Sequence, residues 1–129
     1  MSEVKTNKLT GTSTAGSIAV TGEGNSTTTN LQQGLAKVWV SIDGTGTLAT
    51  RDSFNVASVS DDGTGDYRTT FTSAIANDDY ACPLGTAVGN DFLDNTDMTS
   101  GAITVKTFSV AGSQGDTDPI TFCVMGDLA

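Results

Sequence analysis

Apolar and polar side chains alternate along residues 37–43, which form the clearest pattern in the chain. Val38, Val40 and Ile42 would share one face of an extended segment, the period of a β-strand with one buried side. The opposite, more polar face carries Trp39, the only tryptophan of the chain. The segment therefore predicts a strand with one buried face and an aromatic side chain on the other.

Shorter stretches with the same period follow along the chain. We expect further strands at residues 47–51, 53–60, 67–72, 102–110 and 120–125, with one strand bent near residues 51–53 as the alternative to the first two. In the second of these, Phe54 and Val56 would face the same way. Both faces of residues 120–125 are apolar, which indicates a strand in the centre of a sheet.

Two turns in this pattern use the same four residue types. They read Asp43-Gly44-Thr45-Gly46 and Asp62-Gly63-Thr64-Gly65. Glycine accepts a positive φ, and an Asp side chain before it can close a tight turn by accepting backbone N–H groups. Both turns therefore predict β-hairpins.

The spacing of strands and turns defines the expected fold class. No helical period is present, and turns recur at intervals of roughly ten residues, as in antiparallel sandwiches and barrels. We expect residues 36–129 to form an all-β head domain, either an antiparallel β-sandwich or a small jelly-roll-like barrel. Only 36% of the residues are hydrophobic and 15 are Gly, so we expect a thin core that is completed against other copies of the chain.

Residues 1–35 differ from the rest of the chain. They contain no aromatic residue, and short strand-like pieces are separated by Gly, Ser, Thr and Asn. Isolated hairpins of this kind are marginal in water. We interpret the segment as an extended arm ordered by pairing with another chain, with a partly disordered leader as the alternative. Its candidate interface residues are Val4, Leu9, Ile18 and Val20.

Trp39 has three interpretations. Aromatic side chains are enriched in protein interfaces because they bury a large area at a small entropy cost. We favour a contact with a neighbouring subunit. A ligand contact and packing within the domain are the alternatives.

Residues 85–101 are the least regular segment, which predicts a long loop. Its apolar residues, Phe92, Leu93 and Met98, indicate that the loop packs onto another surface. Oxygen-bearing side chains are dense in it, and hard oxygen ligands suit Ca²⁺. Asp91, Asp94 and Asp97 are therefore a weak calcium candidate, but their spacing does not match an EF-hand, and a solvated acidic loop is the favoured interpretation.

The charge pattern excludes two classes of partner. Residues 1–35 are neutral, and the other 13 acidic and 4 basic residues carry the net charge of −9 (13 − 4 = 9). Without a basic patch, binding to nucleic acid or to an anionic membrane surface is not expected. No apolar run approaches the ~20 residues of a membrane span, so we expect no membrane insertion.

The residue types indicate no catalysis and no cofactor. Histidine, the usual general base and transition-metal ligand, is absent. Most carboxylates stand beside Gly or Asn in turns, where turn formation explains them. The first five residues lack the apolar stretch of a secretory signal, so we expect Cys82 and Cys123 to be reduced thiols, with a disulfide as the alternative.

Several short motifs together resemble a known class of protein. They are Ala36-Lys37-Val38-Trp39-Val40, Gly44-Thr45-Gly46-Thr47, Arg51-Asp52-Ser53-Phe54-Asn55-Val56, Asp62-Gly63-Thr64-Gly65-Asp66-Tyr67, the Phe71 strand and Asp79-Tyr80-Ala81. This run is similar to the distal domains of tail-fibre and related virion surface proteins of tailed bacteriophages, particularly marine ones. The opening Lys5-Thr6-Asn7-Lys8-Leu9 resembles a leader found in such proteins. The resemblance covers residues 36–82 well, residues 1–35 loosely and the last third hardly at all.

The resemblance implies a homotrimeric, all-β virion component made in the host cytoplasm and exposed on the particle. The N-terminal part would attach to tail or capsid proteins or form a stem, and the head would meet a host glycan or surface protein. The chain begins at Met1 without a long shaft, so we expect a short fibre or spike head, with a capsid decoration protein as the alternative. Candidate host contacts, chosen by position, are Asn90, Asp91, Phe92, Asp94 and Asp116.

Overall fold

The computed structural model describes residues 3–12, 18–22, 24, 26–86 and 92–129. The chain divides into two compact units, Met1–Leu35 and Ala36–Ala129. No helix in the described ranges is long and apolar enough to span a membrane.

The first unit contains one small antiparallel hairpin. Strands β1 (Ala19–Thr21) and β2 (Thr28–Asn30) pair with each other, and the N–H of Gly22 donates to the carbonyl of Thr27 (2.8 Å). None of the residues described in this unit is buried. Its hairpin therefore rests on backbone pairing and local contacts rather than on a core.

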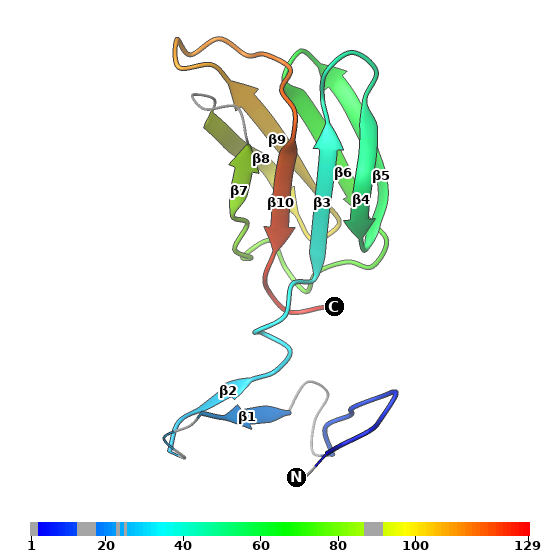
Figure 1. Cartoon of the computed structure of the whole chain (residues 1–129), viewed down its shortest axis with the longest axis vertical. Helices are drawn as coiled ribbons and strands as arrows, with labels where there is room; N and C mark the ends of the chain where they lie inside the picture. Colours follow the sequence, from blue (N-terminus) through cyan, green and yellow to red (C-terminus); the bar gives the residue numbers. More distant parts are fainter. Residues whose placement is uncertain (1–2, 13–17, 23, 25, 87–91) are drawn as a thin grey trace. The chain divides into compact units, whose positions relative to one another are not determined.

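The second unit is an open sandwich of two four-stranded antiparallel sheets (Figure 1). One sheet has the order β4-β3-β10-β7 and the other β5-β6-β9-β8. The strands are β3 (Val38–Asp43), β4 (Ala49–Phe54), β5 (Val56–Gly63), β6 (Asp66–Phe71), β7 (Leu84–Thr86), β8 (Phe92–Thr99), β9 (Ala102–Phe108) and β10 (Ile120–Val124). The predicted all-β sandwich is confirmed, and the barrel alternative does not apply because the sheets stay open. Strand β10 pairs with β3 on one side and β7 on the other, in the central position predicted for it.

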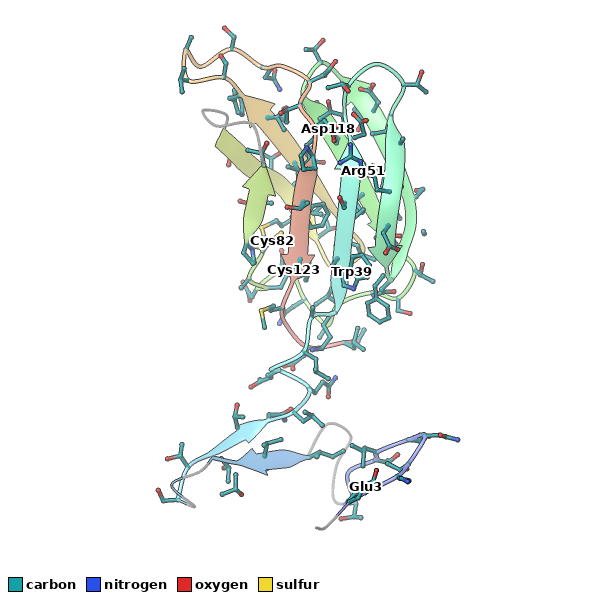
Figure 2. The ribbon with its side chains drawn as sticks, viewed as in Figure 1. Glu3, Trp39, Arg51, Cys82, Asp118 and Cys123 are labelled. Atoms are coloured by element: carbon teal, nitrogen blue, oxygen red, sulfur yellow. The ribbon has the colours of Figure 1, made fainter. Side chains whose placement is uncertain are left out.

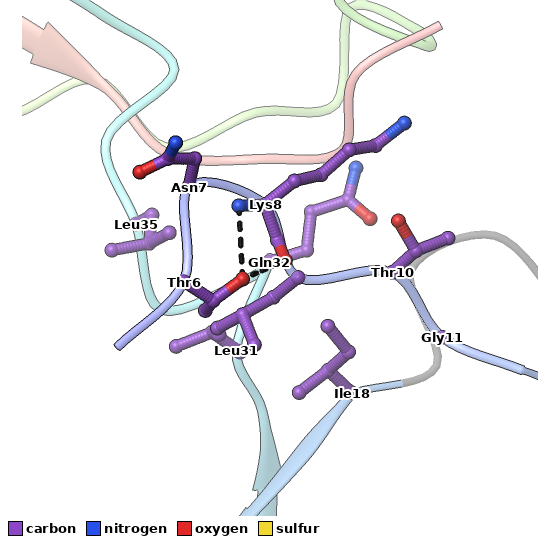
Figure 3. A pocket seen from close by; sticks show the side chains of 10 residues that line it. Thr6, Asn7, Lys8, Thr10, Gly11, Ile18, Leu31, Gln32 and Leu35 are labelled. Carbon is purple, nitrogen blue, oxygen red and sulfur yellow. Dashed lines mark hydrogen bonds between the residues drawn. The ribbon is translucent and has the colours of Figure 1, made fainter. Parts of the chain in front are cut away.

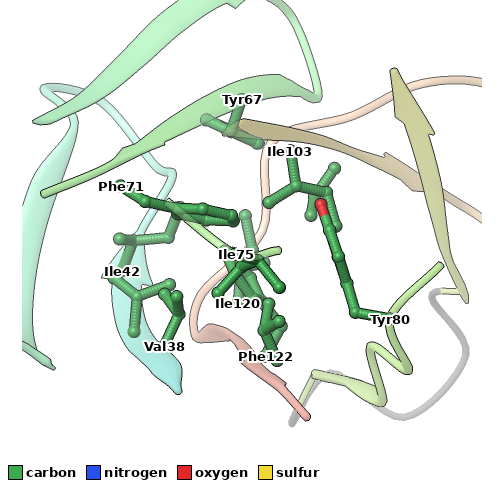
Figure 4. Close-up of a cluster of buried hydrophobic side chains, with 12 residues drawn as sticks. Val38, Ile42, Tyr67, Phe71, Ile75, Tyr80, Ile103, Ile120 and Phe122 are labelled. Carbon is green, nitrogen blue, oxygen red and sulfur yellow. The ribbon is translucent and has the colours of Figure 1, made fainter. Parts of the chain in front are cut away.

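The core lies between the sheets and is built from the alternation seen in the sequence (Figure 4). Val38, Val40 and Ile42 are at most 2% exposed, as the strand pattern predicts. The rings of Phe71 and Tyr80 meet edge to face, with centroids 6.2 Å apart. The remaining members of the buried cluster are Tyr67, Ile75, Ile103, Val105, Ile120, Phe122 and Val124.

A single residue, Asn55, carries the chain from one sheet to the other. Its φ of 58° is left-handed, a conformation that Asn tolerates better than most side chains. The Asn55 amide donates to the carbonyls of Lys37 and Ser73, and its side-chain oxygen accepts the N–H of Ser73 (2.7 Å). Because the chain changes sheet here, Phe54 is exposed while Val56 packs on the core. The prediction that these two side chains face the same way is wrong.

The segment predicted as a long loop contains two strands. β7 begins at Leu84, and β8 pairs with β9 along most of its length. A register shift between Thr96 and Thr99 accompanies the left-handed φ of Asp97 (46°). A bulge of this kind interrupts the two-residue period, which explains why the sequence pattern did not predict β8.

Both Asp-Gly turns form, with different acceptors. In the first, the Asp43 carboxylate accepts the N–H and the hydroxyl of Thr45 (2.9 and 2.6 Å). In the second, the acceptor for the N–H of Gly63 is Asp61, one residue before the repeated motif. The last glycine of each repeat has the same left-handed φ, 64° at Gly46 and 63° at Gly65.

These two glycines provide a matched pair for a stability test. A Cβ at Gly46 would meet nothing within 4 Å, whereas a Cβ at Gly65 would lie 2.8 Å from the backbone nitrogen of Gly115 and the carbonyl oxygen of Thr107. Gly46→Ala should lower the free energy of unfolding by about 1–2 kcal/mol through backbone strain alone. Gly65→Ala should lower it by about 2–5 kcal/mol, because overpacking adds to that strain. Urea unfolding measures both, and equal losses would contradict the close packing at Gly65.

Candidate functional site

The outer face of the β4-β3-β10-β7 sheet carries a row of exposed apolar side chains. Trp39 on β3 pairs with Phe54 on β4 and with Cys123 on β10, so the three stand side by side on one face. Trp39 is 37% exposed and Phe54 is 53% exposed. Figure 2 shows Trp39 and Cys123 on these neighbouring central strands. We call Phe54, Trp39 and Cys123 the aromatic row.

A groove of about 420 Å³ runs beside the aromatic row, across β3, β10 and β7. Trp39 and Cys123 line it together with Pro83, Ser41 and Gly85. A side chain at Gly85 would lie 2.9 Å from the hydroxyl of Thr121, so the missing Cβ leaves the groove open there. The groove is therefore a shallow, mainly apolar depression in an exposed sheet face.

The next cross-strand row on the same face is polar. Asp52 on β4 pairs with Ser41 on β3, which pairs with Thr121 on β10. The carboxylate of Asp52 accepts the N–H of Ser53 (2.8 Å). Among the described residues, Asp52 forms no ion pair. An acidic side chain thus stands beside the apolar groove without a cation.

Both cysteines are free thiols. Cys82 packs against the core, and burial, with Cys123 nearby as the smaller cause, raises the pKa of its thiol to about 12. A thiol with so high a pKa stays protonated at neutral pH and is a poor nucleophile. Cys123 lies in the aromatic row, where it lines the groove.

Hydrogen bonds fasten the loops at one end of the sandwich around Asp116. Its carboxylate accepts the N–H of Gly65 (2.7 Å), and the Tyr67 hydroxyl lies 2.9 Å from the same oxygen and 3.1 Å from the carbonyl of Gly44. The N–H of Gly44 in turn donates to the carbonyl of Thr117 (3.1 Å). Burial, the hydrogen bond to Asp116 and the nearby carboxylates raise the pKa of Tyr67. The Asp116 carboxylate is thereby bound to the two Asp-Gly turns.

Arg51 joins two further carboxylates at this end. Its guanidinium lies 2.5 Å from Asp118 and 3.6 Å from Asp43 (Figure 2). Hydrogen bonds from Thr45, followed by the charge of Arg51, lower the pKa of Asp43. These contacts hold the loops in place, while the second carboxylate oxygen of Asp118 is buried without a hydrogen-bond partner among the described residues.

The acidic residues predicted to contact a host or calcium lie in different settings. Asp94 is exposed on β8 opposite Lys106, and Asp97 is exposed at the bulge. Asn90 and Asp91 lie outside the described residues, as does the side chain of Phe92. Within the described part of the chain, no group of three or more acidic or cysteine side chains could hold a metal ion.

The residues predicted at a subunit interface expose apolar surface in the first unit. Val4, Leu9 and Val20 are 84%, 59% and 45% exposed, and Ile18 is half-buried. Ile18, Leu31 and Leu35 line a groove of about 520 Å³ within this unit (Figure 3). Leu9 lines the same groove. Because none of the described residues of this unit is buried, these apolar side chains do not pack into a core there.

Sequence reasoning missed two features of these surfaces. The alternation predicts that Phe54 faces the same way as Val56, and only the corner at Asn55 places Phe54 in the aromatic row. The bond between Tyr67 and Asp116 joins residues 49 positions apart, a separation that no local pattern encodes. The repeated glycines in the sequence were a signal for this contact, because Gly44 and Gly65 both lie against the loop that contains Asp116.

Comparison of the chain with protein-family models, with curated proteins and with solved structures gives no match.

The buried hydroxyl and thiol groups predict a loss of stability at high pH. Burial, with smaller effects of the nearby Cys82 and Asp78, raises the pKa of Tyr80 to about 12, and the pKa values of Tyr67 and Cys82 are raised as well. The unfolded chain releases these protons first, near the ordinary values of 9.0 for Cys and 10.0 for Tyr. Between pH 7 and about pH 9 the free energy of unfolding should therefore be constant, and above pH 9 it should fall by about 1.4 kcal/mol per pH unit for each proton that the unfolded chain releases first.

Urea unfolding between pH 7 and pH 11 measures this dependence. Cys82→Ala should move the onset of the decline from about pH 9 to about pH 10, because only the tyrosines then remain. A free energy of unfolding that stays flat up to pH 11 would contradict the burial of these groups.

Proposed function

We propose that the chain is a non-enzymatic structural protein of the surface of a tailed-bacteriophage particle, assembled as a homotrimer. The observation that carries the proposal is the aromatic row, in which the exposed rings of Phe54 and Trp39 stand beside the half-buried Cys123. Exposed aromatic side chains beside an apolar groove favour contact with another protein. We assign the chain to a phage particle because residues 36–82 resemble tail-fibre and virion surface proteins.

Several polar groups on these surfaces are engaged within the protein. Arg51, Asp116 and Tyr67 hold the loops together at one end of the sandwich, which we call the fastened loop end. The acids there are bound to Arg51, Tyr67 and backbone N–H groups. The thiol of Cys82 has a raised pKa. Binding and assembly are therefore the chemistry that these residues can perform.

Within the particle, the favoured role is the head of a short fibre or spike that contacts the host surface. The fastened loop end supports this role, because a preorganised surface loses little entropy on binding. Arg51, Asp116 and Tyr67 hold three loops against one another at that end. The host contact would be a surface glycan or protein.

A second role, decoration of the capsid shell, is supported by the first unit. Val4, Leu9 and Val20 expose apolar side chains there, and such side chains favour a protein surface. In this role the first unit would bind neighbouring capsid subunits and the sandwich would cover the joint between them.

Attachment through the first unit can be tested on purified particles. The variant Val20→Asp places a charge where an apolar side chain would be buried, which costs several kcal/mol without compensation. We expect at least a tenfold loss in copies per particle, the equivalent of about 1.4 kcal/mol, measured by quantitative mass spectrometry. Val110→Asp, at a position 72% exposed in the second unit, is the matched control and should leave the number unchanged. Complete absence of the wild-type chain from particles would overturn the proposed function.

The two roles predict different behaviour of the soluble protein. A fibre or spike head should compete with intact phage for adsorption to host cells, because both bind the same receptor. A decoration protein should leave adsorption unchanged, and particles lacking it should lose their DNA at a lower temperature. An adsorption assay and a heat-release assay on the same preparation distinguish the roles.

A further inference from the structure

We propose that the groove beside Trp39 binds residues 4–9 of a second copy of the chain. This inference deepens the proposed function, since it rests on assembly from several copies and names the partner of the aromatic row. It requires nothing about the particle in which the copies assemble.

The groove has the form of a receptor for a short apolar segment. Trp39, Cys123 and Pro83 line it, and Gly85 leaves its floor open. Its volume of about 420 Å³ lies in the range of binding pockets, about 300–1,000 Å³. It is shallow and lies on an exposed sheet face, so an incoming segment meets no barrier.

Residues 4–9 have the composition that this groove requires. Among the described residues of the first unit, Val4 and Leu9 are the two most exposed large apolar side chains, at 84% and 59%. The hydroxyl of Thr6 donates to the carbonyl of Lys8 (2.7 Å) and accepts its N–H (3.2 Å). This local turn stands directly before Leu9, which follows it as an exposed apolar side chain.

Charge selects this segment over other parts of the chain. Lys5 and Lys8 are the only basic residues among residues 1–35. Lys5 pairs with Glu3 (3.4 Å), and Lys8 stands directly before Leu9. Asp52 pairs with Ser41, a residue of the groove lining, and has no ion pair among the described residues. Residues 36–129 carry the whole net charge of −9. A basic, apolar segment therefore complements an apolar groove with an acidic border.

The same charges disfavour the obvious competitor, a second sandwich docked face to face. Two aromatic rows in contact would bring together two domains that each carry −9, and like charges repel. Contact between a segment of one copy and a groove of the next is instead heterologous. Such contacts generate a closed ring when the rotation between copies allows it. A ring of three copies would satisfy every groove.

A native thiol in the groove provides the test. Leu9→Cys in the full chain should form an intermolecular disulfide with Cys123 when the soluble protein is oxidised with diamide, which accepts the two electrons and two protons released. Non-reducing electrophoresis should show dimers and a closed trimer, with most of the chain cross-linked. The same oxidation of Leu9→Cys in a Cys123→Ser background should leave the protein monomeric on the gel.

The controls separate this contact from others. Val110→Cys is a matched exposed position and should give no cross-link to Cys123. The thiol of Cys82 is protonated near neutral pH and does not compete. Cross-links that persist in the Cys123→Ser background, a disulfide formed within one copy, or no cross-link at all would each overturn the inference. Cross-linking tests the contact between copies, whereas mass spectrometry tests the presence of the chain in particles. The inference and the proposed particle location can therefore fail separately.

Discussion

The side chain of Tyr67 joins the core of the sandwich to its loops, and the order of the loop end depends on it. Its ring is 1% exposed between the sheets, and its hydroxyl reaches the Asp116 carboxylate and the Gly44 carbonyl. The same carboxylate oxygen accepts the N–H of Gly65. One buried side chain thus holds two turns and the loop after β9 in register with the hydrophobic core.

Alternation and turn chemistry in the sequence were sufficient to predict the sandwich, its central strand and the exposure of Trp39. They failed where a local irregularity broke the two-residue period, at the corner formed by Asn55 and at the bulge near Asp97. They also failed for the Tyr67–Asp116 bond, since long-range partners are chosen by the folded topology rather than by neighbouring residues. The aromatic row illustrates both outcomes. The strand pattern correctly predicted that Trp39 lies on the polar face, but it wrongly predicted that Phe54 faces the same way as Val56.

Polar side chains serve different purposes on two surfaces of the sandwich. Most of the charged side chains at the loop end are committed to holding loops, as in the contacts of Arg51 with Asp118 and Asp43. The central region of the β4-β3-β10-β7 sheet is different. There the outer face carries Trp39, a thiol and an open groove, with Asp52 at its border. A partner could contact such a surface mainly through complementary shape and apolar area.

The entry of the chain into the sandwich has a mechanical consequence. The second unit begins at Ala36, and the chain passes directly into β3, which is paired on both sides, with β4 and with β10. The N–H of Lys37 already donates to the carbonyl of Val124 (2.7 Å). A pull on the N-terminal segment along β3 therefore loads two rows of hydrogen bonds in shear at once, instead of peeling them apart one by one. A domain tethered in this way resists tension at its attachment point, a useful property for any protein anchored at one end and exposed to solvent flow at the other.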